Sequence, residues 1–138
     1  MNEKSKILSL RISYWAGAIA DGFSVIPMMF PDIGKILLSY KDFSPTPEYQ
    51  YAMGIGASLM LGWTILLIWA DRKPLERRGI VLITLVPVML GIFLNSIYIL
   101  LLGKLTAIGL IPQWSMMGVV AILFIIGYYN TKDLRTEQ

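Results

Sequence analysis

Four long apolar stretches, separated by short polar segments, dominate the chain. They cover residues 12–30, 51–70, 79–102 and 110–129. Each is about as long as the ~20 residues that an α-helix needs to cross the ~30 Å hydrocarbon core of a bilayer. The pattern predicts an all-α polytopic integral membrane protein. We expect residues 1–138 to form a single domain, a four-transmembrane-helix antiparallel bundle. Its expected partner is the lipid bilayer that surrounds it.

The composition agrees with this class and removes several others. Of the 138 residues, 56% are hydrophobic and 15% are charged, against about 25% charged residues in soluble domains. The chain has no Cys and no His, which removes disulfides, thiolate or imidazole metal sites and Cys-His or Ser-His catalysis. We therefore expect no enzyme activity, no cofactor and no metal. Nucleic acid is not an expected partner, because the net charge of +3 is accounted for by residues that set topology.

Positive charge gathers on one side of the predicted spans. Nine Lys or Arg residues lie in the two tails and the second loop, and three lie in the first and third loops. The first group is Lys4, Lys6, Arg11, Arg72, Lys73, Arg77, Arg78, Lys132 and Arg135, and the second is Lys35, Lys41 and Lys104. Because Lys and Arg stay preferentially on the inner side, we expect a multi-pass protein of the plasma membrane with both termini cytoplasmic.

One acid lies deep within an apolar stretch. Asp21 is ten residues after Arg11, about 15 Å along a helix and close to the bilayer midplane. Small and polar neighbours share its side of the helix, so we expect it to face protein. We expect protonation, exposure to water in a cavity or a hydrogen bond to offset the desolvation of the carboxylate. The predicted polar interior consists of Asp21, Ser24, Ser58, Asn95 and Tyr98.

Small residues mark the predicted packing faces of the helices. Gly17 lies on the Asp21 side of the first span, and Gly54, Ser58 and Gly62 follow one another at four-residue spacing in the second. The seam predicted for the third span is Thr84, Val88, Gly91, Asn95, Tyr98 and Leu102. Pro87 interrupts it and frees the carbonyl of Ile83, which Thr84 or a neighbouring helix is expected to satisfy. Such faces suit packing within one chain, a homodimer or contact with another membrane protein.

The first loop has an apolar pattern of its own. Ile33, Ile36, Leu37, Leu38 and Tyr40 suit a short helix in the membrane interface, ended by a turn over residues 44–48. A hydrophobic connector without helical structure is an equal alternative.

The second loop is a short, highly charged turn. Arg72, Lys73, Arg77 and Arg78 are expected to anchor topology and to attract anionic lipid headgroups. Its ADRKPLERRG resembles the cytoplasmic signature of major facilitator transporters, whose Asp-Arg and following basic pair brace neighbouring helices; we interpret this as convergence, because the chain is too short for twelve spans. The whole chain resembles small uncharacterised four-span membrane proteins with a WADRKPLERRG-like turn, which implies no activity.

Two functions follow from these residues. The first is an interaction, accessory or scaffold membrane protein, in which Asp21 bonds to Asn95 or a hydroxyl and holds the bundle together. The alternative is a small proton-coupled carrier, in which Asp21 exchanges a proton for a cationic or polar substrate.

Overall fold

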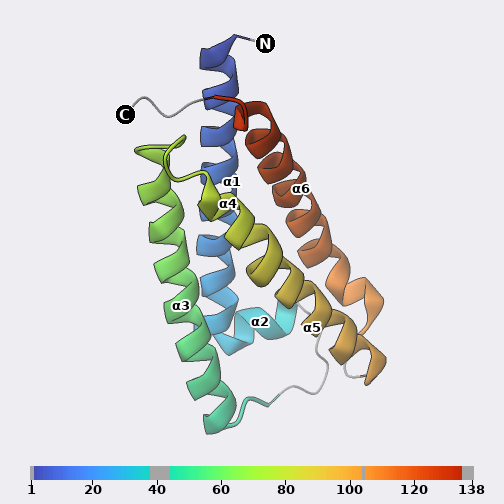
Figure 1. Ribbon diagram of the computed structural model, residues 1–138. Helices are drawn as coiled ribbons and strands as arrows, with labels where there is room; N and C mark the ends of the chain where they lie inside the picture. Colours follow the sequence, from blue (N-terminus) through green and yellow to red (C-terminus); the bar gives the residue numbers. More distant parts are fainter. Residues whose placement is uncertain (1, 38–43, 104, 135–138) are drawn as a thin grey trace.

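The described part of the chain is helical, with no β-strand among its residues (Figure 1). The structure, a computed structural model, describes residues 2–37, 44–103 and 105–134. Its elements are α1 (Glu3–Met29), α2 (Pro31–Leu37), α3 (Pro47–Asp71), α4 (Gly79–Ile83), the π-helix η1 (Thr84–Met89), α5 (Leu90–Leu101) and α6 (Ala107–Thr131). The predicted all-α class is confirmed for these residues.

The long helices run antiparallel to their neighbours in the chain (Figure 1). α4, η1 and α5 join into one rod, and α1 packs along both α3 and α6. The start of α1 and the end of α6 lie at the same end of the molecule, which we call the termini end. α2 lies toward the opposite end, where it packs against the last turn of α1.

Three helical rods of the described chain are long and apolar enough to cross a membrane. They are α3, the rod Gly79–Leu101 and α6. α1 is not among them, although its 27 residues would extend about 40 Å. Its central part carries Asp21 together with glycine, serine and aromatic residues, and these lower its hydropathy. These three helices indicate that the chain is a membrane protein. The predicted four-span bundle is not confirmed, because the hydropathy of α1 is too low.

The first loop follows the helical alternative in part. α2 contains Ile33, Ile36 and Leu37, whereas Leu38 and Tyr40 lie outside the described residues. The turn expected over residues 44–48 is wrong at its C-terminal half, because α3 already begins at Pro47. The Thr46 hydroxyl caps this helix by accepting from the Tyr49 backbone N–H over 3.3 Å, and proline suits the first helical position.

The third rod changes register at Pro87. Proline has no backbone N–H, and residues 84–89 around it form a π-helix, whose i→i−5 bonding accommodates one extra residue in the turn. After Pro87 the buried residues of this rod are Met89 and Ser96 rather than the predicted Val88 and Asn95. The predicted seam is therefore correct at Thr84 and displaced by one residue afterwards.

The Thr84 hydroxyl does not satisfy the carbonyl of Ile83 as predicted. Its Oγ1 donates to the Ile80 carbonyl over 2.8 Å and accepts from Trp63 Nε1 over 3.2 Å. The second bond joins α3 to η1 through side chains of two helices that are each apolar enough to cross a membrane.

Candidate functional site

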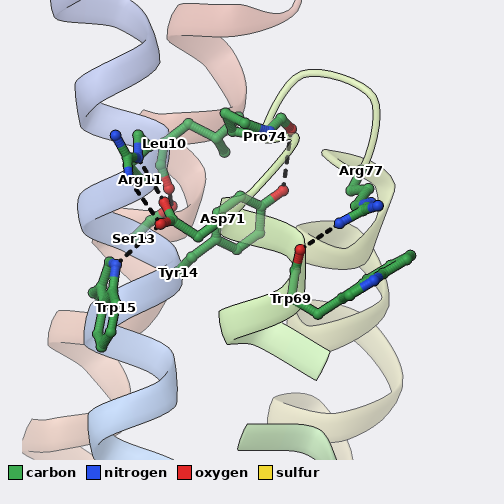
Figure 2. A network of polar contacts seen from close by, with 9 residues as sticks. All are labelled: Leu10, Arg11, Ser13, Tyr14, Trp15, Trp69, Asp71, Pro74 and Arg77. Carbon is green, nitrogen blue, oxygen red and sulfur yellow. Dashed lines mark hydrogen bonds and ion pairs between the residues drawn. The ribbon is translucent and has the colours of Figure 1, made fainter. Parts of the chain in front are cut away.

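An ion pair joins α1 to α3 at the termini end (Figure 2). Arg11 Nε donates to Asp71 Oδ1 over 2.8 Å and Arg11 Nη2 donates to Oδ2 over 2.9 Å. Trp15 Nε1 also donates to Oδ2, over 3.2 Å. Asp71 is buried, whereas half of the Arg11 side chain is exposed. A shielded carboxylate needs such charge-assisted partners, and we call Arg11, Trp15 and Asp71 the α1–α3 clamp.

The loop after α3 is fastened to both helices of the clamp (Figure 2). The hydroxyl of the fully buried Tyr14 donates to the Pro74 carbonyl over 3.3 Å. Arg77 donates to the Trp69 carbonyl, and its guanidinium carbon lies 3.3 Å from the centre of the Trp69 ring. A cation thus satisfies a carbonyl at the C-terminal end of α3, where the helix dipole favours positive charge.

Arg78 likewise donates hydrogen bonds to backbone carbonyls at the C-terminal end of α6. Its Nη1 donates to the carbonyls of Thr131 over 2.7 Å, Lys132 over 3.1 Å and Leu134 over 3.2 Å. α6 is also tied to α1, because Asn130 Nδ2 donates to Ser9 Oγ over 3.2 Å. The termini end therefore holds polar contacts that reach every long rod.

These contacts correct the predicted headgroup site in part. Arg77 and Arg78 bind backbone carbonyls of their own chain, and Lys73 pairs with Glu76 over 3.0 Å on the exposed surface. Arg72 is exposed and its side chain has no partner among the described residues. Of the four predicted residues, Arg72 is thus the one whose exposed charge has no partner among the described residues, and headgroup binding stays a prediction.

Asp21 lies half-buried in the middle of α1. Its Oδ2 is shielded from solvent, and the part of the chain that the structure describes offers it no hydrogen-bond partner. The indole Nε1 of Trp114, on α6, is shielded and unpartnered in the same way. Buried polar atoms without partners are rare in native proteins, and each calls for water, a proton or a ligand.

The structure does not gather the predicted polar interior. Ser24 Oγ donates to the Ala20 carbonyl and Ser58 Oγ donates to the Gly54 carbonyl, so both hydroxyls bond within their own helices. Ser58, Asn95 and Tyr98 are exposed on the helix surface. Asn95 and Tyr98 were placed inward by a regular helical period, which the π-helix breaks. The prediction that Ser58, Asn95 and Tyr98 surround Asp21 is therefore wrong, whereas a polar role of Ser24 beside Asp21 stays a prediction.

Close approaches at Gly17 and Gly127 join α1 to its neighbours in place of most of the predicted glycine faces. Gly17 is confirmed as a packing residue, because an added Cβ would lie 2.6 Å from Phe124 Cζ and 3.1 Å from Leu67 Cδ1. Gly127 was missed: a Cβ there would lie 2.8 Å from Ser13 Oγ and 3.1 Å from Leu10 Cα. The predicted packing roles of three other glycines within the chain are wrong, because a Cβ would meet nothing within 4 Å. These are Gly54, Gly62 and Gly91.

The packing face of α3 lies about one residue away from the predicted one. Ala57, Leu67 and Ala70 are buried against the rest of the bundle, whereas Ser58 and Gly62 are exposed. One residue along a helix is a rotation of about 100°. The stripe of small residues therefore predicted correctly that α3 packs through a small residue, Ala57, but it predicted the wrong side of the helix.

The described residues contain no group of three acidic side chains close enough to hold a metal ion. No family model, curated protein or solved structure matches this chain. Any function must therefore be derived from the α1–α3 clamp and from the environment of Asp21. The clamp itself had a signal in the sequence, because Arg11 and Asp71 carry opposite charges and flank two predicted spans on the same side.

Proposed function

We propose that α1 is a fourth membrane span and that both termini lie in the cytoplasm. α1 packs against α3 and α6 along much of its length, and both of those helices are long and apolar enough to cross a membrane. A helix in this position shares their depth. The excess of Lys and Arg in the tails and the second loop supports a cytoplasmic termini end.

We propose that the protein is a small proton-coupled carrier in which Asp21 exchanges a proton for a cationic substrate. The observation that carries this proposal is the shielded Oδ2 atom, which has no hydrogen-bond partner among the described residues. A purely structural acid would bond across the bundle, but its expected partner Asn95 is exposed. The ion pair that joins two helices is supplied instead by Arg11 and Asp71. Asp21 is therefore left for proton or cation exchange.

An apolar groove on another side of α1 supports a substrate with a hydrophobic body. The groove has a volume of about 430 Å³ and lies between α1 and α6. Its lining residues are Ala16, Ile19, Ala20, Phe23, Ser115, Met116, Val119 and Val120. Asp21 follows Ala20 in the chain but is not among the lining residues. The groove therefore supports the hydrophobic body of the substrate, and a substrate charge close to the Asp21 carboxylate is part of the proposal.

Proton release tests this proposal. Wild-type protein in weakly buffered detergent is expected to release about one proton per bound tetraphenylphosphonium ion, because the cation displaces the proton of Asp21. The Asp21→Asn variant is expected to release none, because an amide has no titratable proton. Its folding is expected to be retained, because the amide has the size and shape of the protonated carboxyl. The release is read from a pH indicator dye, and folding from circular dichroism in the same detergent.

Ser24→Ala is the matched control one turn away. The Ser24 hydroxyl bonds within its own helix, so this variant is expected to release protons as the wild type does. Equal release by Asp21→Asn and wild type would refute the carrier proposal. Loss of the folded state in Asp21→Asn would return Asp21 to the structural role.

An accessory or scaffold role is the second candidate. It is favoured by polar residues that α5 exposes toward lipid, Asn95 above all, because such residues suit contact with another protein. The two functions are compatible in one chain, since Asp21 and Asn95 lie on different helices and Asn95 faces away from the bundle interior.

A further inference from the structure

Asn95 is an unsatisfied amide on an apolar helix surface. It is exposed on α5, and no hydrogen bond to its side chain exists among the residues that the structure describes. Hydroxyl residues in the long helices satisfy themselves by donating to a carbonyl four residues earlier, as Thr64, Thr84 and Ser96 do. The Asn95 amide has no such bond, so its donors and its acceptor are left to whatever surrounds the helix.

The depth of Asn95 makes lipid a poor partner. The span Gly79–Leu101 has its centre near Leu90, and five residues outward correspond to about 7.5 Å of rise. The hydrocarbon core extends about 15 Å on each side of the midplane. Asn95 therefore lies within the hydrocarbon, where neither water nor headgroups reach its amide, and where an unpaired amide is costly.

Asn95 shares its face with residues that permit close helix contact. Gly91 is one turn earlier and exposed, with open space where a Cβ would be. Tyr98 is one turn later and 60% exposed. α5 meets α6 on another side, through the ring contact of Phe93 with Trp114 at 5.6 Å between centroids. The face formed by Gly91, Asn95 and Tyr98, which we call the α5 face, is thus turned away from its own bundle.

We propose that the α5 face binds a second copy of this chain. An asparagine amide is self-complementary, because its carbonyl accepts and its NH₂ group donates. Two copies inserted in the same orientation are related by a two-fold axis along the membrane normal, so residues of equal depth meet. Asn95 then pairs with Asn95 of the partner subunit, and Gly91 allows the two backbones to approach.

The π-helix at Pro87 determines which side of α5 points away from the bundle. With a regular helix, Asn95 would follow Thr84 into the bundle interior, as the seam in the sequence predicts. The extra residue of the π turn brings Ser96 inward instead and leaves Asn95 outward. The seam residues after Pro87 therefore remain a packing surface, but one that serves contact between copies.

Cysteine cross-linking tests the proposal, because the chain has no native Cys. Gly91→Cys and Gly118→Cys are a matched pair: both positions are exposed glycines with open space for a Cβ, and both lie near the middle of their spans. With copper phenanthroline in liposomes, Gly91→Cys is expected to form a disulfide-linked dimer and Gly118→Cys to remain monomeric. Equal cross-linking at the two sites, or none at Gly91→Cys, would overturn the proposal.

The role of Asn95 is measured by dimer dissociation in liposomes. Asn95→Leu is expected to raise the dimer dissociation constant about threefold to thirtyfold, the range for interhelical polar contacts, while Asn95→Gln retains dimerisation. Circular dichroism is expected to be unchanged, because Asn95 makes no contact needed for folding of the chain. A dissociation constant for Asn95→Leu equal to that of wild type would rule out the amide pair, and capture of a different membrane protein with no self-association would assign the α5 face to that partner.

Discussion

Replacing Gly127 by leucine is expected to destabilise the protein by about 3 kcal/mol or more. The backbones of α1 and α6 lie close together here, because a Cβ on Gly127 would already lie 3.1 Å from the Leu10 Cα atom and 3.3 Å from the Ser9 carbonyl oxygen. Because backbone atoms cannot rotate away, the two helices must separate, and overpacking of this kind costs about 1–3 kcal/mol or more. Unfolding by SDS in mixed micelles, followed by tryptophan fluorescence, measures the change.

Gly118→Leu is the control for this prediction. Gly118 lies in the same helix, with nothing within 4 Å of an added Cβ. The same substitution there is expected to leave the free energy of unfolding unchanged or slightly higher, since glycine is a poor helix former. Similar losses at both positions would show that the effect comes from α6 itself and not from its contact with α1.

Asp71→Asn is expected to lower the ratio of folded to unfolded protein about tenfold. The substitution keeps the shape of the side chain but removes the charge that accepts from Arg11 and Trp15, and hydrogen bonds to charged groups are among the stronger ones. The guanidinium of Arg11 then loses its counter-charge at the membrane boundary. The same SDS titration measures this change.

Two further variants distinguish the contribution of the α1–α3 clamp to stability from that of surface charge in general. Glu76→Gln removes an exposed pair with Lys73 and is expected to have little effect on stability. Adding Arg11→Gln to Asp71→Asn is expected to cost less than the sum of the single changes, because both variants break the same contact. Additive losses would mean that Arg11 and Asp71 stabilise the protein independently.

The positions of the apolar rods could be predicted well because they depend on chain length and hydropathy alone. The second, third and fourth predicted spans agree with α3, the rod Gly79–Leu101 and α6 to within a few residues at most ends. The ends of the helices were less predictable. α1 begins at Glu3 rather than near residue 12, since a helix continues into water wherever its backbone hydrogen bonds are satisfied.

The inward faces of the helices were predicted only where the helical period is undisturbed. Gly17 on α1 contacts both neighbouring helices as expected. On the third rod, the consequence of Pro87 was foreseen as a lost hydrogen bond, but not as a change of register, so Asn95 was assigned to the wrong side. Whether a proline kinks a helix, widens one turn or ends it depends on the packing of neighbouring side chains, which sequence spacing does not contain.

The sequence by itself determined the helical class and the three apolar rods, because hydrocarbon imposes length and charge limits that a single chain reveals. The depth of Asp21 within a fourth span stays a prediction. The tertiary structure decided which side chains meet. It joined Arg11 to Asp71 across sixty residues, left Asp21 Oδ2 without a partner among the residues that the structure describes and turned Asn95 outward. These outcomes depend on the rotation of each helix relative to its neighbours.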